Sequence, residues 1–141
     1  MIIFTNGCFD EIHIGHIRLL RYCHDLCLRE SPFGFNFIVG LNSDESIKRL
    51  KGPDRPLYPL KYRIEVLESI YYVNWVEVFE EDTPIELIRR IKPDIIVKGG
   101  DYKPEDVVGY GLAKVIIYKG PEWEEIFQIT SKRHEKKSCG S

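Results

Sequence analysis

The chain has 141 residues, with 20 lysines and arginines against 22 aspartates and glutamates, so its formal net charge is −2. This length corresponds to one domain, and the nearly balanced charge argues against binding to nucleic acid or to an anionic membrane surface. With 43% hydrophobic and 30% charged residues, the composition is that of an ordinary folded domain. Disorder, collagen and coiled coil are therefore excluded as descriptions of the chain.

The first third of the chain alternates between strand and helix patterns. The apolar run Ile2–Thr5 predicts a short buried strand, and apolar residues at three- and four-residue spacing predict an amphipathic helix over Gly15–Arg29. A second β-rich apolar run covers Phe35–Leu41. The polar residues 42–44 are typical helix caps, and they predict a short helix that ends near Leu50.

The middle of the chain repeats this alternation. Prolines and a glycine predict a loop over Lys51–Pro59, after which helical spacing predicts a helix over Leu60–Tyr71. The segment Trp75–Phe79 is a third predicted strand. A further helix is expected to start at residues 82–84, where a proline suits the first turn, and to run to Ile91.

Two more apolar segments, Ile95–Lys98 and Val115–Tyr118, complete the predicted strands. Most of the strands are apolar throughout, as in a parallel sheet that helices cover on both faces. Alternating strands and helices therefore predict an α/β fold, a Rossmann-like doubly wound five-stranded parallel sheet in a single domain over residues 1–130. A basic, flexible tail is expected over 131–141. In such folds, ligands bind beyond the carboxyl ends of the strands.

The amino-terminal residues and the cysteines bear on the cellular compartment. The first residues show no basic and apolar pattern of a signal peptide, and the apolar runs are far shorter than the roughly 20 residues that span a bilayer. We therefore expect a cytoplasmic protein with reduced thiols. Cys23 and Cys27 lie one helical turn apart on the apolar stripe, so we expect them to pack in the core.

Glycines and histidines cluster directly after the first predicted strand, where a ligand is expected. Gly7 and Gly15 allow a ligand to approach the backbone closely, and the free N–H groups at the start of the helix favour an anion. His13 and His16 are three residues apart, so they share one face of the first helical turn. This combination predicts a polyphosphate site. A zinc site is the alternative, but it would need further ligands such as Cys8 and Asp10.

The sequence Gly7-Cys8-Phe9-Asp10, followed by His-Ile-Gly-His at 13–16, resembles the cytidylyltransferase-like nucleotidyltransferase superfamily. Class I aminoacyl-tRNA synthetases share the second element, but they are much longer and carry tRNA-binding domains. Further stretches between residues 2 and 110 are similar to the adenylyltransferase domain of bacterial ADP-heptose synthases: Val39–Asp44, Arg49–Pro53, Arg55-Pro56 with Arg63, Glu81–Pro84 and Val97–Glu105.

The resemblance implies an enzyme that transfers a nucleotide. A sugar phosphate, heptose 1-phosphate, would attack the α-phosphorus of ATP in the presence of Mg²⁺, giving an ADP-sugar and pyrophosphate. The attacking phosphate oxygen is already an anion, so no general base is needed. Two alternatives stay open: a cytidylyltransferase that uses CTP with glycerol 3-phosphate or another polyol phosphate, and a nucleotide-binding protein without catalysis. A homodimer is also left open.

The resemblance further implies roles for individual residues. His13, His16 and Lys51 would be catalytic, through contacts with the phosphate oxygens. Asp10, which would also lie near a Mg²⁺ held mainly by phosphates, would contact the sugar phosphate together with Arg55 and Arg63. The remaining predicted residues would bind the nucleotide: Asn6, Gly7, Cys8, Phe9, Gly15, Lys98, Gly99, Asp101, Tyr102, Thr130 and Ser131.

Several of these residues have a simpler explanation. Lys51 and Arg63 would be solvated surface residues, and Asp10 would cap a helix or a turn. The run Gly99-Gly100-Asp101 would be a glycine turn with a solvated acid. Tyr102 would stack on a base or simply cover the site.

The sequence departs from the family pattern toward its carboxyl end. The family has a longer helix before the last strand, and Gly109–Ala113 leaves little room for one. The family also closes its nucleotide site with a helix cap that contacts the triphosphate. Thr130-Ser131-Lys132 is the nearest match here.

Overall fold

A computed structural model describes residues 1–120, 125, 128 and 129. Along the chain, strands alternate with helices as the sequence predicts. The elements are β1 (Ile2–Gly7), α1 (Ile14–Glu30), β2 (Asn36–Asn42), α2 (Asp44–Lys51), α3 (Leu60–Glu68), β3 (Trp75–Phe79), α4 (Ile85–Ile91), β4 (Ile95–Gly99), the short 3₁₀ helix η1 (Pro104–Asp106) and β5 (Lys114–Tyr118).

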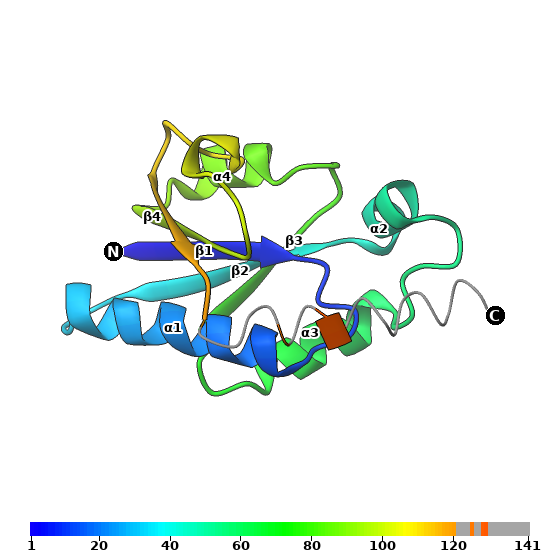
Figure 1. The fold of residues 1–141 in the computed structure, drawn as a ribbon, viewed down its shortest axis with the longest axis horizontal. Coiled ribbons are helices and arrows are strands. Elements are labelled where there is room, and N and C mark those ends of the chain that lie inside the picture. The colour runs from blue at the N-terminus through cyan, green and yellow to red at the C-terminus, as the bar shows by residue number, and fades with distance from the viewer. Residues whose placement is uncertain (121–124, 126–127, 130–141) are drawn as a thin grey trace.

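The five strands form one parallel sheet in the order β3-β2-β1-β4-β5 (Figure 1). The chain winds outward from β1 to β3 and then returns to place β4 on the other side of β1. Ile3 accordingly pairs with Phe37 of β2 on one side and with Ile95 of β4 on the other. The predicted doubly wound Rossmann-like sheet is confirmed, and β1 and β4 flank the point where ligands bind in such sheets.

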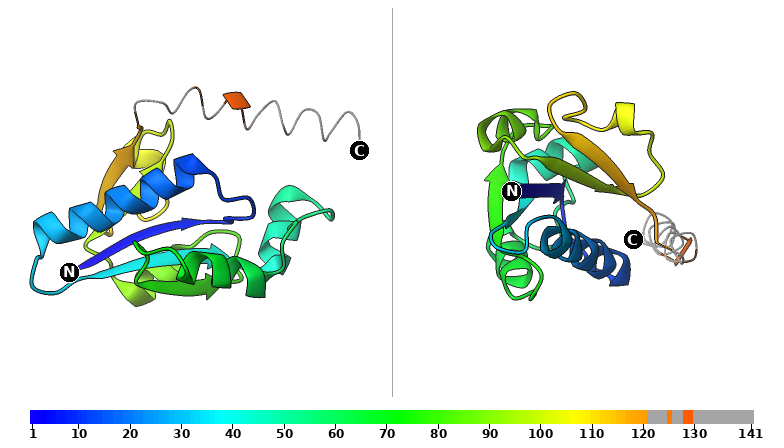
Figure 2. Two further views of the ribbon diagram at one scale, coloured as in Figure 1. Left: turned by 90° about the horizontal axis from the view of Figure 1, so that it is seen from below. Right: turned by 90° about the vertical axis from the view of Figure 1, so that its left-hand side faces the viewer.

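Helices cover both faces of the sheet (Figures 1 and 2). On one face, Ile3 packs in a cluster with Leu20 of α1 and Leu67 of α3. On the other face, its neighbour Phe4 packs in a second cluster with Ile88 of α4. Successive side chains of a strand point to opposite faces, which is why an unbroken apolar strand belongs to a sheet covered on both sides.

The structure tests the predicted burial of the two helix cysteines and the shortness of the apolar runs. Cys23 and Cys27 are fully buried and unpaired on the inner face of α1, so the core-packing prediction is confirmed. Within the described part of the chain, no helix combines the length and the apolar character needed to cross a membrane.

The largest difference between a predicted and an observed boundary is at the end of α3. The helix expected over Leu60–Tyr71 ends at Glu68, because the N–H of Ile70 donates to the carbonyl of Leu67, three residues back, at 3.1 Å and the chain then turns. Ile70 still packs against the core from this turn, which explains its helical spacing. Lys51, expected to begin a loop, is instead the last residue of α2.

The segment between β4 and β5 contains η1 and turns, and no α-helix. Gly109 shows how closely this segment approaches the sheet, because a Cβ atom there would lie 2.4 Å from Cδ1 of Ile96. Its φ of +99° also favours glycine. The expectation that a longer helix has no room here is confirmed.

Candidate active site

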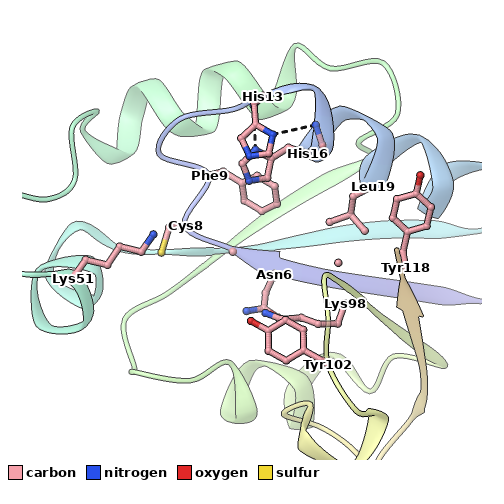
Figure 3. Close-up of a pocket in the computed structure, with 13 residues that line it drawn as sticks. Asn6, Cys8, Phe9, His13, His16, Leu19, Lys51, Lys98, Tyr102 and Tyr118 are labelled. Atoms are coloured by element: carbon pink, nitrogen blue, oxygen red, sulfur yellow. Dashed lines mark hydrogen bonds between the residues drawn. The ribbon is translucent and has the colours of Figure 1, made fainter. Parts of the chain in front are cut away.

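The amino end of α1 is built from the two histidines of the motif. His13 is the N-cap, and its Nδ1 accepts the backbone N–H of Gly15 at 3.0 Å. His16 accepts the backbone N–H of His13 through its own Nδ1 at 3.1 Å. This is a capping box, in which each side chain satisfies a backbone donor that the helix leaves free. The two rings lie side by side, with centroids 4.0 Å apart (Figure 3).

These hydrogen bonds determine which nitrogen of each ring carries the proton. Because both Nδ1 atoms accept an N–H, each neutral ring is protonated on Nε2. Burial, with smaller contributions from His13 and Lys51, lowers the pKa of His16 to about 4. Burial also lowers the pKa of His13. At neutral pH the pair therefore presents Nε2–H donors rather than cations, and a bound polyanion would raise both pKa values.

A pocket of about 330 Å³ lies beside the histidines, at the carboxyl ends of β1, β4 and β5 (Figure 3). Many of the predicted site residues line this pocket: Asn6, Gly7, Cys8, Phe9, His13, Gly15, His16, Lys51, Lys98, Gly99 and Tyr102. Their roles stay predictions, but the structure brings them together.

Leu19 and Tyr118 also line the pocket and were missed by the sequence analysis. Leu19 follows His16 by three residues, so the helical spacing that paired the histidines also places Leu19 on their face. Tyr118 ends β5, and the rule that ligands bind beyond carboxyl ends of strands could have identified it.

Two lysines give the pocket positive charge. Lys51 extends toward Cys8 from the end of α2 (Figure 3). Lys98 comes from β4, and its ammonium lies 5.0 Å from the centroid of the Tyr102 ring. Burial lowers the pKa of Lys98 and raises the pKa of the Cys8 thiol. No carboxylate is found among the described residues that line this pocket, so its charge suits an anion.

A second pocket, of about 220 Å³, adjoins the first. Asp10, Glu11 and Arg55 line only this second pocket of the two, whereas several residues line both: Cys8, Phe9, His13, His16 and Lys51. The histidines and Lys51 therefore stand where two separate molecules could meet.

Asp10 is almost fully buried, and its carboxylate is already engaged by the chain that follows α2. It accepts the backbone N–H groups of Leu57 at 2.7 Å and of Tyr58 at 2.9 Å, and Arg55 lies 3.5 Å away. This geometry favours the turn-capping explanation that the sequence left open. Asp10 holds the loop that carries Arg55 against the segment that follows β1.

Arg63 is 1% exposed, so the solvated-surface explanation is wrong for this residue. Its guanidinium donates to three backbone carbonyl oxygens and to the carboxylate of Asp44, and these contacts connect the ends of β1 and β2 to the loop before α3. The acceptors are the oxygens of Tyr58 at 3.0 Å, Cys8 at 3.0 Å and Asn42 at 2.7 Å, and Oδ1 of Asp44 at 2.7 Å. A phosphate contact would require Arg63 to give up these bonds, and we assign it a structural role.

The remaining predictions concern Asp101, the carboxyl-terminal residues and the zinc alternative. Asp101 is exposed and lines none of the pockets described above. Thr130, Ser131 and the predicted tail over 131–141 lie outside the described residues. Within the described ranges, no group of three or more His, Cys, Asp or Glu side chains is placed to hold a metal ion, so the zinc ligand set is not assembled there.

Comparison with known sequences identifies close relatives. The chain is 52% identical over 115 residues to the "Bifunctional protein HldE" of a Nitratiruptor species, a match that covers 82% of this chain and 23% of that protein. It is also 52% identical over 108 residues to the protein of the same name from Proteus mirabilis, covering 77% of this chain and 21% of that protein. The chain thus spans less than a quarter of the length of these relatives.

Solved structures show the same fold at lower identity. A lipopolysaccharide core biosynthesis protein from Thermoplasma volcanium aligns with a TM-score of 0.65 and 22% identity, over 84% of this chain and 94% of that one. A macrolide-efflux protein from Streptococcus pneumoniae aligns with a TM-score of 0.61 and 21% identity, over 83% of this chain and 45% of that one.

The match to a family agrees with the motif, the sheet order and the position of the pocket. The model of the cytidylyltransferase-like family matches residues 4–135, which is nearly the whole chain. The chain therefore belongs to the cytidylyltransferase-like family of nucleotidyltransferases.

Proposed function

We propose that this protein is a sugar-phosphate adenylyltransferase, acting on heptose 1-phosphate and ATP. A phosphate oxygen of the sugar phosphate attacks the α-phosphorus of ATP and forms a new P–O bond. The bond from the α-phosphorus to the oxygen that bridges to the β-phosphate breaks, and that oxygen leaves with pyrophosphate. The products are ADP-heptose and pyrophosphate, and no proton has to be removed from the attacking oxygen.

The observation that carries this proposal is the shared wall between the two pockets. Transfer between two bound substrates requires them to meet at one point, in line and within reach of groups that stabilise charge. His13, His16 and Lys51 line both pockets, so a reacting phosphorus between the pockets would be within reach of all three.

The charges of the two pockets suggest which substrate each would hold. The larger pocket has Lys98 in addition to the shared groups, together with the amino end of α1, and it suits the triphosphate. The smaller pocket has Arg55 from the loop that Asp10 anchors, and it suits the phosphate of the sugar.

In this arrangement the histidines bind and orient rather than remove a proton. Their Nε2–H groups would donate to phosphate oxygens whose charge grows during transfer, and the capping bonds at Nδ1 hold both rings in place before substrate arrives. Lys51 would bring a full positive charge to the same point. Because these Nε2–H donors are preorganised, they would not have to rearrange as the reaction proceeds.

Mg²⁺ is part of the proposal. The Asp10 carboxylate already accepts two backbone N–H bonds, which fits a metal held by phosphate oxygens and water rather than by a cage of protein ligands. When bound, the ion would neutralise negative charge on the departing pyrophosphate.

The choice of heptose and of ATP rests on sequence similarity. The stretches that resemble the ADP-heptose synthases include residues of both pockets, namely Lys51, Arg55, Lys98 and Tyr102, and the HldE proteins are 47–52% identical over this region. A cytidylyltransferase remains the second candidate, because the family model that matches the chain bears that name.

Pyrophosphate release tests the proposal. The protein would be incubated with Mg²⁺ and heptose 1-phosphate or glycerol 3-phosphate, each with ATP or with CTP, and a His16→Ala protein prepared in parallel would report contaminating activity. We expect release only with ATP and heptose 1-phosphate. Release only with CTP would assign the protein to the cytidylyltransferases. Binding of ATP without release in any combination would support a nucleotide-binding protein that does not catalyse transfer.

A further inference from the structure

The polarity of the larger pocket changes along α1. His16, Leu19 and Tyr22 are each three residues apart, so they follow one another along one side of the helix at steps of about 4.5 Å. His16 and Leu19 line the pocket directly, and Tyr22 stacks on Tyr118, which also lines it. The pocket therefore runs from polar N–H donors at the amino end of α1 to an apolar, aromatic end further along this helix.

Tyr118 is held in one orientation at this aromatic end. Its ring stacks on Tyr22 with centroids 4.6 Å apart and an angle of 25° between the planes. Its backbone carbonyl accepts the N–H of Gly100 at 3.0 Å, which ties it to the turn after β4. Gly120 lies so close that a Cβ atom there would be 2.9 Å from the tyrosine hydroxyl oxygen. A ring braced in this way loses little further freedom when a ligand packs against it.

Leu19 packs closely against Gly99 at this end of the pocket. Gly99 has no side chain, and a Cβ atom at that position would lie 3.2 Å from Cδ2 of Leu19. Leu19, Gly99 and Tyr118 thus offer an apolar surface one to two helical turns from the phosphate-binding groups. A nucleoside triphosphate has the same polarity, since its charge lies at one end and its flat aromatic base at the other.

We propose that Tyr118, braced by Tyr22, is the residue that holds the base of the nucleotide and favours a purine over a pyrimidine. The inference deepens the proposed function and rests on a nucleotide occupying the larger pocket. An aromatic side chain gains more contact from the larger purine ring system, and replacement of a stacking side chain by alanine weakens binding by about 1–3 kcal/mol per base. That energy corresponds to roughly a 5- to 150-fold change in Kd.

Binding of ATP, CTP and inorganic tripolyphosphate, each with Mg²⁺, separates the base from the phosphates. Calorimetric titration without the sugar phosphate avoids turnover. For Tyr118→Ala we expect ATP to bind about tenfold more weakly, CTP to lose less, and tripolyphosphate to change by less than about twofold. Tyr118→Phe keeps the ring and should bind ATP as the unchanged protein does. Tyr22→Ala removes the brace and should weaken ATP binding by a smaller factor.

Two further variants serve as controls for folding and for nonspecific effects of removing a tyrosine. Tyr118→Leu keeps an apolar side chain in the fold but has no ring, so it should share the selective loss of ATP affinity even if the alanine variant folds poorly. Tyr110→Ala is the matched control, because Tyr110 is 59% exposed and lines neither pocket of the candidate site. It should leave all three affinities unchanged.

The outcomes distinguish this inference from the proposed function. Unchanged ATP affinity in Tyr118→Ala and Tyr118→Leu would overturn the inference, and so would an equal loss of ATP and tripolyphosphate in folded protein. The same is true if the unchanged protein binds ATP no more tightly than tripolyphosphate. A selective loss of ATP affinity in a protein that never releases pyrophosphate would support the role of Tyr118 and overturn the transferase proposal.

Discussion

The His13–His16 pair and the Asp10–Arg63 pair lie around the same segment after β1, and sequence similarity assigns all four residues to substrate phosphates. In the structure, each histidine uses Nδ1 to cap α1 and keeps Nε2 for another partner. Asp10 and Arg63 instead both bind the backbone of Tyr58. Asp10 accepts its N–H, and Arg63 donates to its carbonyl oxygen. The difference lies in which polar atoms stay available: Nε2 of each histidine is left for a ligand, whereas Asp10 and Arg63 use their polar atoms to hold the chain in place.

The largest expected effect is on catalysis at the histidine pair. His16→Ala should lower kcat by about 10²–10³, which is the effect of removing one donor to a transition state. The measurement is the steady-state rate of pyrophosphate release with the substrates that the unchanged protein uses. Turnover close to that of the unchanged protein would show that the pair only caps the helix.

The second prediction concerns stability at the other pair. Arg63→Met should lower the free energy of unfolding by about 3 kcal/mol, because it leaves three carbonyl oxygens and the carboxylate of Asp44 without their buried donor. Urea denaturation measures this. Arg89→Met is the matched control, since the Arg89–Glu86 ion pair is exposed and should contribute less than about 1 kcal/mol. Equal effects of the two substitutions would contradict the structural role of Arg63.

The third prediction concerns the pH dependence of stability that His16 causes. The pKa of His16 is about 4 in the folded protein, against about 6.5 in an unfolded chain, so unfolding takes up a proton between these values. His16 therefore contributes its full stabilisation above about pH 6.5 and loses it as the pH falls toward 4. The loss should reach about 2 kcal/mol at pH 4.5.

Thermal unfolding at pH 7 and pH 4.5 checks this prediction, with His16→Gln as the reference. Glutamine at the third helical position can still accept the N–H of His13 but does not titrate. The melting temperature of the unchanged protein should fall more than that of the variant over this interval. Identical decreases would show that His16 does not carry the pH dependence.

The smallest effect is expected for Asp10→Asn. The amide keeps one carbonyl oxygen to accept either the Leu57 or the Tyr58 N–H, so the variant should lose about 1 kcal/mol of stability. Because this loop carries Arg55, the KM for the sugar phosphate should rise while the KM for ATP stays the same. A rise confined to the KM for ATP would place Asp10 in the nucleotide site instead.

The sequence by itself determined the fold class and the location of the candidate site. Apolar strands that alternate with amphipathic helices indicate a parallel sheet with both faces buried, and five such strands in 141 residues suit a doubly wound arrangement. The carboxyl ends of parallel strands lie at one edge, so Gly7, His13, Lys98 and Gly99 could be brought together from their positions at or just beyond strand ends. The helical spacing of His13 and His16 was also sufficient to place their rings side by side.

The tertiary structure alone decided what several charged and aromatic residues contact. Arg63 lies in a helix with a pattern typical of the surface, and the carbonyl oxygens that bury it come from segments 5 to 55 residues away. In the sequence, Tyr118 is the last residue of an ordinary predicted strand. In the structure, α1 places Tyr22 against its ring. Periodicity reports which face of an element is apolar, but hydrogen bonds and ring contacts between distant segments depend on how those elements pack.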